Sequence, residues 1–387
     1  EPRISTQWFV RMKNLADPAL KEVIEGRIKI HPGDKFMATY KYWLENVKDW
    51  CISRQLWWGQ QIPAWYDDDG RFVVAENEKK AKEIFNTQFS TSNIQLRQDP
   101  DVLDTWFSSW LWPMEVFKGV SHPGNEDIKY YYPTSVLVTG QDIIFFWVAR
   151  MIMSGMEYMK EKPFSDVYFT GMVRDKQGRK MSKQLGNSPD LLDLIDRHGA
   201  DAVRFGIMIS SPAGNDLLFD DSSCEQGRNF NNKIWNALKL VKLWEGKKAT
   251  GNGQQAISNE QKAKSNFAID WFENRLNQVS LEVERAFLEF RLSEALKTIY
   301  SLIWDDFCSW YIELTKGRPS DERVKQTLAH VLDAALKLLH PFCPFVTEEI
   351  WLRLRELGAQ KAKLLMTASW PEPEAKRVDA ALEGGMA

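Results

Sequence analysis

Between residues 136 and 171 a strand, a turn, a helix and a second strand follow one another almost without spacers. Residues 136–140 (Val-Leu-Val-Thr-Gly) have the pattern of a buried strand, residues 143–156 that of a helix, and residues 167–171 (Val-Tyr-Phe-Thr-Gly) that of the next strand. This succession is typical of a parallel sheet, whose ligands bind at the carboxyl ends of the strands. Both strands end in Thr-Gly, where a ligand could approach the backbone, although ordinary turns use glycine as well.

Beyond residue 220 the strand patterns stop. Helices are predicted over residues 224–244, 267–290, 292–314, 322–339 and 345–357, with a Gly-rich linker at residues 246–254. Upstream, residues 27–32 and 62–66 read as short strands, residues 36–47 as a helix, and residues 71–98 as a polar, peripheral segment. Another helix is predicted with Ser188 as its N-cap, Pro189 at its first position and its end at His198-Gly199. An α/β half therefore precedes an all-α half.

The composition excludes several classes of protein. The chain has 387 residues, 44 % of them hydrophobic and 27 % charged, which is close to the globular average, and a membrane protein and a disordered chain are both ruled out. The formal net charge of −3 means that any nucleic acid must bind through local basic clusters. Four widely spaced cysteines indicate neither a zinc ribbon nor a disulfide scaffold and favour a reducing, cytoplasmic setting. Neither a membrane nor DNA is expected as a partner.

The sharpest local motif is Gly178-Arg179-Lys180-Met181-Ser182-Lys183, in a polar loop between a strand and a helix. Three cations and a hydroxyl on a Gly-flanked loop near strand ends suit a polyanion whose charge changes during a reaction, such as a triphosphate. A basic turn taken alone is more often solvated surface, so the motif needs support from elsewhere in the chain.

That support comes from several long blocks. Lys-Met-Ser-Lys at residues 180–183 resembles the second signature of the class I aminoacyl-tRNA synthetases. Blocks at residues 49–55 (Asp-Trp-Cys-Ile-Ser-Arg-Gln), 101–109 and 186–190 resemble the branched-aliphatic subgroup of that family, and residues 339–351 resemble its anticodon-binding bundle. The block at residues 139–151, which starts Thr-Gly-Gln-Asp, resembles most the members that use valine.

The resemblance implies a fold and a division of the chain. Residues 1–221 would form the second half of a Rossmann-like catalytic domain with the Lys-Met-Ser-Lys loop at 180–184, residues 222–369 a helical anticodon-binding domain, and residues 370–387 a tail. The implied reaction joins L-valine to ATP, giving valyl-adenylate and pyrophosphate, and then passes the valyl group to tRNA-Val. ATP and Mg²⁺ are the expected cofactors.

The resemblance also implies roles for particular residues. Lys180, Ser182 and Lys183 would be catalytic, and with Met181 they would contact ATP. Gly140, Gln141 and Asp142, at a strand end, would hold ribose or the substrate ammonium. The remaining candidates are Trp106, Ile143 and Ile144 as walls of the valine pocket, and Arg228, Asn229, Asn232 and Lys233, together with Asn231, as a face toward tRNA. Each has a plainer alternative: core packing for the pocket residues, a solvated face for the helix, and a structural ion pair for Arg54.

Four departures from the family pattern keep other functions open. The first signature, His-Ile-Gly-His, is absent from the sequence, as are an editing domain and a coiled-coil arm, and Gln184 stands where serine is usual. The chain is therefore expected to be inactive alone but able to bind tRNA. The alternatives are an isoleucine-specific enzyme, a non-catalytic RNA-binding module and a helical scaffold, the last of which leaves the Lys-Met-Ser-Lys loop unexplained.

Overall fold

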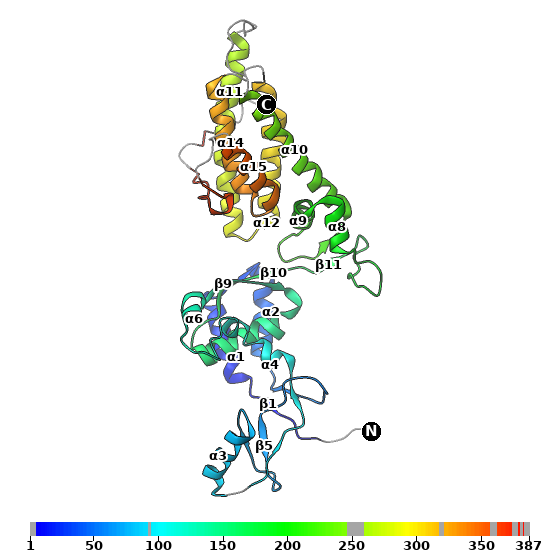
Figure 1. Cartoon of the computed structure of the whole chain (residues 1–387), viewed down its shortest axis with the longest axis vertical. Helices are drawn as coiled ribbons and strands as arrows, with labels where there is room; N and C mark the ends of the chain where they lie inside the picture. The colour runs from blue at the N-terminus through cyan, green and yellow to red at the C-terminus, as the bar shows by residue number, and fades with distance from the viewer. Residues whose placement is uncertain are drawn as a thin grey trace. The chain divides into compact units, whose positions relative to one another are not determined.

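The computed structural model describes residues 5–91, 94–245, 259–316, 321–356, 362–373, 378–379 and 382. The chain forms two compact units, Glu1–Phe169 and Thr170–Ala387, coloured from blue to green and from green to red in Figure 1. The sequence suggested a boundary at residue 221 between a catalytic part and an anticodon-binding part. That boundary lies inside the second unit and stays a prediction. The linker at residues 246–254 and most of the 370–387 tail lie outside the described residues.

The first unit is built on a three-stranded sheet in the order β2-β10-β9. Its strands are β2 (Lys29–His31), β9 (Thr134–Gly140) and β10 (Phe164–Thr170), and β10 runs parallel to β2 with Val167 opposite Ile30. The helices α1 (Lys13–Ile24) and α2 (Gly33–Glu45) pack against each other, and α2 also contacts β2. Their apolar side chains share one core with the sheet, in which Val167 and Phe169 are fully buried. The predicted strands are confirmed, and the sheet contains a parallel pair, β2 with β10.

The helix expected at residues 143–156 is present but irregular. It begins as a 3₁₀ turn, η1 (Gln141–Ile143), continues as the π-helix η2 (Ile144–Ala149) and α7 (Arg150–Ser154), and ends as the π-helix η3 (Gly155–Met159). Three bulky aromatics of the wide turn have separate neighbours. Phe145 stacks on Trp43, Phe146 stacks on Trp106, and the Trp147 indole donates a hydrogen bond to the backbone carbonyl of Ser109. Such π-turns are often found near functional sites.

Residues 64–98 form a small β-structure with its own core, which the sequence did not predict beyond one strand. Strand β5 (Ala64–Tyr66) pairs antiparallel with β6 (Phe72–Val74) and with β7 (Arg97–Gln98), and α3 (Glu78–Phe89) buries Ala81 and Phe85 against them. The rest of the first unit consists of short elements. Two antiparallel strand pairs are formed by β1 (Phe9–Val10) with β3 (Trp50–Cys51) and by β4 (Ser53–Arg54) with β8 (Val102–Leu103). The short helices are α4 (Thr105–Ser109), α5 (Trp112–Glu115) and α6 (Glu126–Tyr131).

The second unit begins with a strand pair and becomes entirely helical. Strand β11 (Val173–Arg174) pairs parallel with β12 (Leu217–Leu218), and α8 (Leu191–His198) and α9 (Ala200–Ile209) lie between them in sequence. The bundle then consists of α10 (Asp221–Glu245), α11 (Asn259–Leu288), α12 (Leu292–Ser301), η4 (Leu302–Tyr311), α13 (Ile312–Thr315), α14 (Glu322–Leu339), α15 (Pro344–Glu356) and η5 (Leu365–Thr367). The predicted change from α/β to all-α is confirmed.

One predicted helix start is wrong. The N-cap of α8 is Asp190 and not Ser188, because the Asp190 carboxylate accepts hydrogen bonds from the backbone N–H groups of Leu192 (2.8 Å) and Asp193 (3.4 Å). Pro189 consequently lies before the cap instead of at the first helical position. The predicted end is correct, since Gly199 follows the helix with φ of +89°, a left-handed conformation that favours glycine.

Candidate functional site

The basic loop, residues 174–187, is braced from inside by Asp175. This carboxylate is buried and accepts hydrogen bonds from the backbone N–H of Gln177 (3.0 Å) and of Arg179 (2.9 Å). It also accepts from the Arg179 guanidinium (2.8 Å) and from the Asn187 side-chain amide (2.9 Å). The Asn187 hydrogen bond, followed by those from Arg179, holds the pKa of Asp175 well below its usual range. Asp175 therefore remains ionised and fixes the turn.

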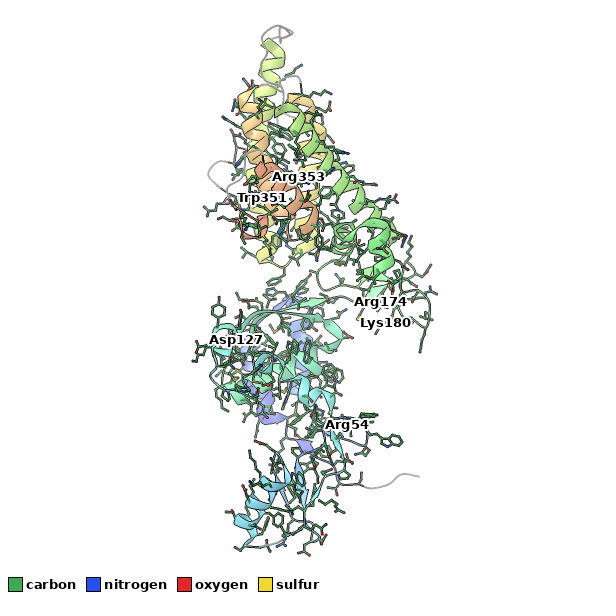
Figure 2. The ribbon with its side chains drawn as sticks, viewed as in Figure 1. Arg54, Asp127, Arg174, Lys180, Trp351 and Arg353 are labelled. Atoms are coloured by element: carbon green, nitrogen blue, oxygen red, sulfur yellow. The ribbon has the colours of Figure 1, made fainter. Side chains whose placement is uncertain are left out.

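Asn187 closes the loop from its other end. Its side-chain oxygen accepts from the backbone N–H of Ser182 (2.9 Å), and its amide nitrogen also donates to the Lys180 carbonyl (3.3 Å). The Ser182 hydroxyl accepts in turn from the backbone N–H of Leu185 (3.2 Å). Arg174 and Lys180 face each other as an antiparallel bridge, and Figure 2 shows them side by side on this loop. The Lys-Met-Ser-Lys segment is thus an ordered turn.

The cations of the loop fall into two groups. Arg174 pairs with Asp216, Lys176 with Asp220 (2.9 Å) and Arg179 with Asp175 (2.7 Å). Within the described part of the chain, no carboxylate lies within ion-pair distance of Lys180 or Lys183, and both are exposed. The sequence grouped Arg179 with the two lysines, but its guanidinium is occupied by Asp175. Two ammonium groups and the Ser182 hydroxyl remain for an external polyanion.

The two Thr-Gly strand ends have different structural causes. At Gly171 an added Cβ would lie 1.8 Å from the carbonyl oxygen of Asn215, so this glycine allows two backbones of the second unit to approach. At Gly140 an added Cβ would lie 2.6 Å from the Asp142 carboxylate. This carboxylate belongs to an exposed residue at the start of η1, next to the half-buried Gln141. The close backbone approach explains the glycine at position 171, and a role for Gly140 in binding stays a prediction.

The structure places the three pocket candidates on neighbouring elements of the first unit. Trp106, in α4, is half-buried, stacks on Phe146 and donates its backbone N–H to the Asp104 carboxylate (2.7 Å). Ile143 is half-buried, whereas Ile144 is 6 % exposed and belongs to the core, as the plainer alternative has it. Asp104 also forms an ion pair with Arg54, labelled in Figure 2, so the structural alternative for Arg54 is confirmed.

The helix face proposed for tRNA lies on α10. Arg228, Asn229 and Asn232 are exposed, and Arg228 has only an exposed ion pair with Glu225 at 3.4 Å. Lys233 differs, because its ammonium group lies 3.8 Å from the centre of the Trp304 ring. The face therefore divides into exposed polar side chains and a lysine held by the bundle, and contact with tRNA stays a prediction.

Sequence reasoning missed the residues that hold the loop. Asp175 precedes Lys-Gln-Gly, a spacing typical of a tight turn, and that signal could have identified it. Asn187 was visible only as part of the block at residues 186–190. Lys180 and Lys183 belong to the second unit, whereas Gly140, Gln141 and Asp142 belong to the first. The roles of all these side chains in binding remain predictions.

Comparison with known families identifies the chain. Residues 1–220 match the family model described as tRNA synthetases class I (I, L, M and V), and residues 270–386 match that of the anticodon-binding domain of tRNA ligase. The first match covers more than half of the chain, so the chain belongs to the class I tRNA synthetases.

Curated relatives narrow the comparison to one branch. The chain is 53 % identical over 378 residues to the valine–tRNA ligase of Parabacteroides distasonis, covering 96 % of this chain and 42 % of the relative. It is 55 % identical to that of Phocaeicola vulgatus over 91 % of this chain and 40 % of the relative, and 44 % identical to that of Chlorobaculum tepidum over 97 % and 42 %. The chain thus spans about two fifths of the length of these relatives.

Solved structures agree on the fold. A LeuRS from Agrobacterium radiobacter K84, in a ternary complex with tRNA and LeuAMS, superposes with a TM-score of 0.64 at 19 % identity over 90 % of this chain and 46 % of that one. Methionyl-tRNA synthetase from Mycobacterium tuberculosis, in complex with methionyl-adenylate, gives 0.63 at 19 % identity over 90 % and 62 %. The Rossmann-like catalytic half followed by a helical anticodon-binding domain is therefore the fold of this chain.

Proposed function

We propose that this chain is the part of a valine–tRNA ligase that carries the second half of the catalytic fold and the anticodon-binding bundle. Support comes from the curated relatives, which bear that name at 51–55 % identity over nearly all of the chain. The reaction would join the carboxylate of L-valine to the α-phosphorus of ATP with loss of pyrophosphate, and then move the valyl group to the terminal ribose of tRNA-Val. Four free cysteines among the described residues accord with the cytoplasmic location that the sequence favours.

The observation that supports catalysis best is the pair of unpaired lysines on a braced loop. Negative charge grows on the β- and γ-phosphates as pyrophosphate leaves, and Lys180 and Lys183 would neutralise it while Ser182 donates a hydrogen bond. Because Asp175 and Asn187 fix the turn, these groups need little reorganisation when the charge appears. Preorganised donors of this kind are typically worth about 10²–10³ in rate.

Mg²⁺ would reach the site with ATP. Among the described residues no group of three or more His, Cys, Asp and Glu side chains could hold a metal ion. The ion would be coordinated by phosphate oxygens, and no step proposed for the loop depends on it.

The amino-acid pocket would lie in the first unit beside Trp106. Its indole is half-buried against Phe146 and would be a rigid wall that limits the depth of the pocket. Ile143, also half-buried, lies at the end of η1 and close in sequence to Phe146. Ile144 would act from the core. Gln141 and Asp142 would hold ribose or the substrate ammonium. An apolar pocket of limited depth disfavours an amino acid with one additional methylene by about 10–200-fold. Isoleucine, which exceeds valine by one methylene, is therefore the informative competitor.

The bundle would bind tRNA-Val. On α10 the side chains of Arg228, Asn229 and Asn232 are exposed and would contact phosphates or bases. Lys233, whose ammonium group is held over the Trp304 ring, would add a positive charge to this face. The same chain shows no helix in its described part that is long and apolar enough to cross a membrane.

The test uses a protein of the relatives' full length that contains this chain. Lys183→Ala should lower valine-dependent exchange of pyrophosphate into ATP by about 10² or more while tRNA binding changes little. Lys176→Ala is the matched control, because its ammonium group is already paired with Asp220. An unchanged single-turnover activation rate in the Lys183 variant would refute the role of the loop, and faster exchange with isoleucine than with valine would reassign the substrate.

A further inference from the structure

Arg150, in the helix α7, is a buried cation with no carboxylate of its own. Its side chain is 5 % exposed, and among the described residues it forms no ion pair. Its Nε has no hydrogen-bond partner, and Nη1 reaches only the Phe146 carbonyl at 3.5 Å. The guanidinium lies 3.5 Å from the centre of the Trp50 ring. An aromatic face attracts the charge but leaves the N–H donors unused.

The charges nearest to Arg150 do not satisfy it. Asp104 and Arg54 act on it with opposite signs, and they are paired with each other. Burial lowers the pKa of Arg150 to about 10, so the side chain still carries its proton at neutral pH. A buried guanidinium with idle donors is costly unless an anion meets it.

Arg150 is one of the residues that line a cavity of about 820 Å³, and all of these residues belong to the first unit. The apolar walls are aromatic: Trp43 stacks on Phe145 at 5.1 Å, and Tyr42 and Trp50 complete them. This volume is within the range of pockets that hold small ligands.

The polar rim of the cavity sets the charge of its ligand. Lys48 and Asp49 are both exposed, and one Asp49 oxygen accepts the backbone N–H of Met12 at 3.1 Å. One guanidinium, one ammonium and one carboxylate leave a single positive charge, which suits a monoanion better than a phosphate dianion. A carboxylate also matches the planar fork of a guanidinium with two parallel hydrogen bonds.

We propose that this cavity binds a carboxylate at Arg150, attached to a flat apolar group that lies against Trp43. Two sources share this chemistry: a free aromatic acid, and an acidic side chain next to an aromatic residue in a polypeptide. The curated relatives are more than twice as long as the region they share with this chain, and their remaining segments are candidates for the second source. None of the residues that line this cavity is assigned to the activation reaction proposed above, so the two proposals can be tested separately.

The experiment titrates the purified chain by calorimetry with five probes. Sodium benzoate and the capped dipeptide acetyl-Glu-Phe-amide represent the two sources. Benzamide and acetyl-Gln-Phe-amide are their neutral matches, and inorganic phosphate tests a general anion site. We expect benzoate or the Glu peptide to bind at least tenfold more tightly than its neutral match and than phosphate. Arg150→Gln should remove this preference, whereas Lys48→Gln, at the exposed rim, should change affinity by less than threefold.

Each result decides the proposal. Binding of benzoate that is lost in Arg150→Gln supports a free acid as ligand, and binding of the Glu peptide alone supports a polypeptide carboxylate. Equal binding of phosphate, or an affinity unaffected by Arg150→Gln, would overturn the proposal, as would the absence of binding by either carboxylate. If Arg150→Gln does not fold, Arg150→Lys decides, because it keeps the charge and loses the planar fork. Benzoate affinity in Arg150→Lys equal to that of the unsubstituted chain would also overturn it.

Discussion

Replacing Asn187 by alanine should loosen the basic loop without altering the ammonium group of Lys180 or Lys183. The Asn187 side chain makes three hydrogen bonds, to the Ser182 N–H, the Lys180 carbonyl and the Asp175 carboxylate, at 2.9, 3.3 and 2.9 Å. Asn187→Ala removes all three and adds no new partner. The loop should then sample open conformations far more often, because its second brace is gone.

The size of the effect follows from the hydrogen bonds. A net contribution of about 1 kcal/mol for each gives an upper figure of about 3 kcal/mol. Half-exposure of Asn187 and Ser182 allows water to replace part of it, so about 1.5–3 kcal/mol is expected. Since every 1.4 kcal/mol is a factor of ten, the open population should rise by about 10–10².

Hydrogen exchange measures this directly, because the Ser182 amide is itself one of the donors. The exchange rate of that amide should rise by the same factor in Asn187→Ala, while amides of α10 should not change. Ser188→Ala is the control, since Ser188 is an exposed neighbour. An unchanged Ser182 rate would show that Asn187 does not hold the loop. In a protein of the relatives' length, the variant should slow activation less than Lys183→Ala does.

Three further outcomes are expected. The chain alone should not exchange pyrophosphate into ATP with valine, because the sequence lacks the first signature; measurable valine-dependent exchange would show a more complete site. The pKa of Asp175 is depressed in the folded chain, so ionised Asp175 stabilises the fold above the pKa of an unfolded aspartate, about 3.9, and this stabilisation is lost as the pH falls below that value. Denaturant titrations from about pH 5 to 3 should therefore show a steeper loss of stability for the unsubstituted chain than for Asp175→Asn. Parallel curves for the two proteins would contradict this. The chain should bind tRNA weakly, with an affinity that falls steeply as salt rises, and truncation at residue 220 should abolish binding; equal binding of valine tRNA and an unrelated tRNA by the helical half would refute anticodon reading.

The sequence predicted those features that depend on local periodicity. The strands ending at Gly140 and Thr170 and the long helices after residue 220 each carry their pattern within a short stretch of sequence, so neighbouring residues suffice to define them. The loop could be located in the same way, since its glycines and cations are contiguous. The N-cap of α8 was misplaced by two residues, because Ser188 and Asp190 are both good caps and only the backbone geometry chooses between them.

Features that depend on distant side chains could not be predicted. The contact between Asp175 and Asn187 joins residues twelve apart through two left-handed glycines, Gly178 and Gly186, and no periodic pattern encodes it. Arg150 carries the same lesson further. In sequence it is one polar residue on an apolar helix and would be placed toward solvent, yet the structure buries it against Trp50, a hundred residues away. Burial of a charge is decided by what packs around it, so a buried arginine with no ion pair among the described residues is a signal that only the folded chain can give.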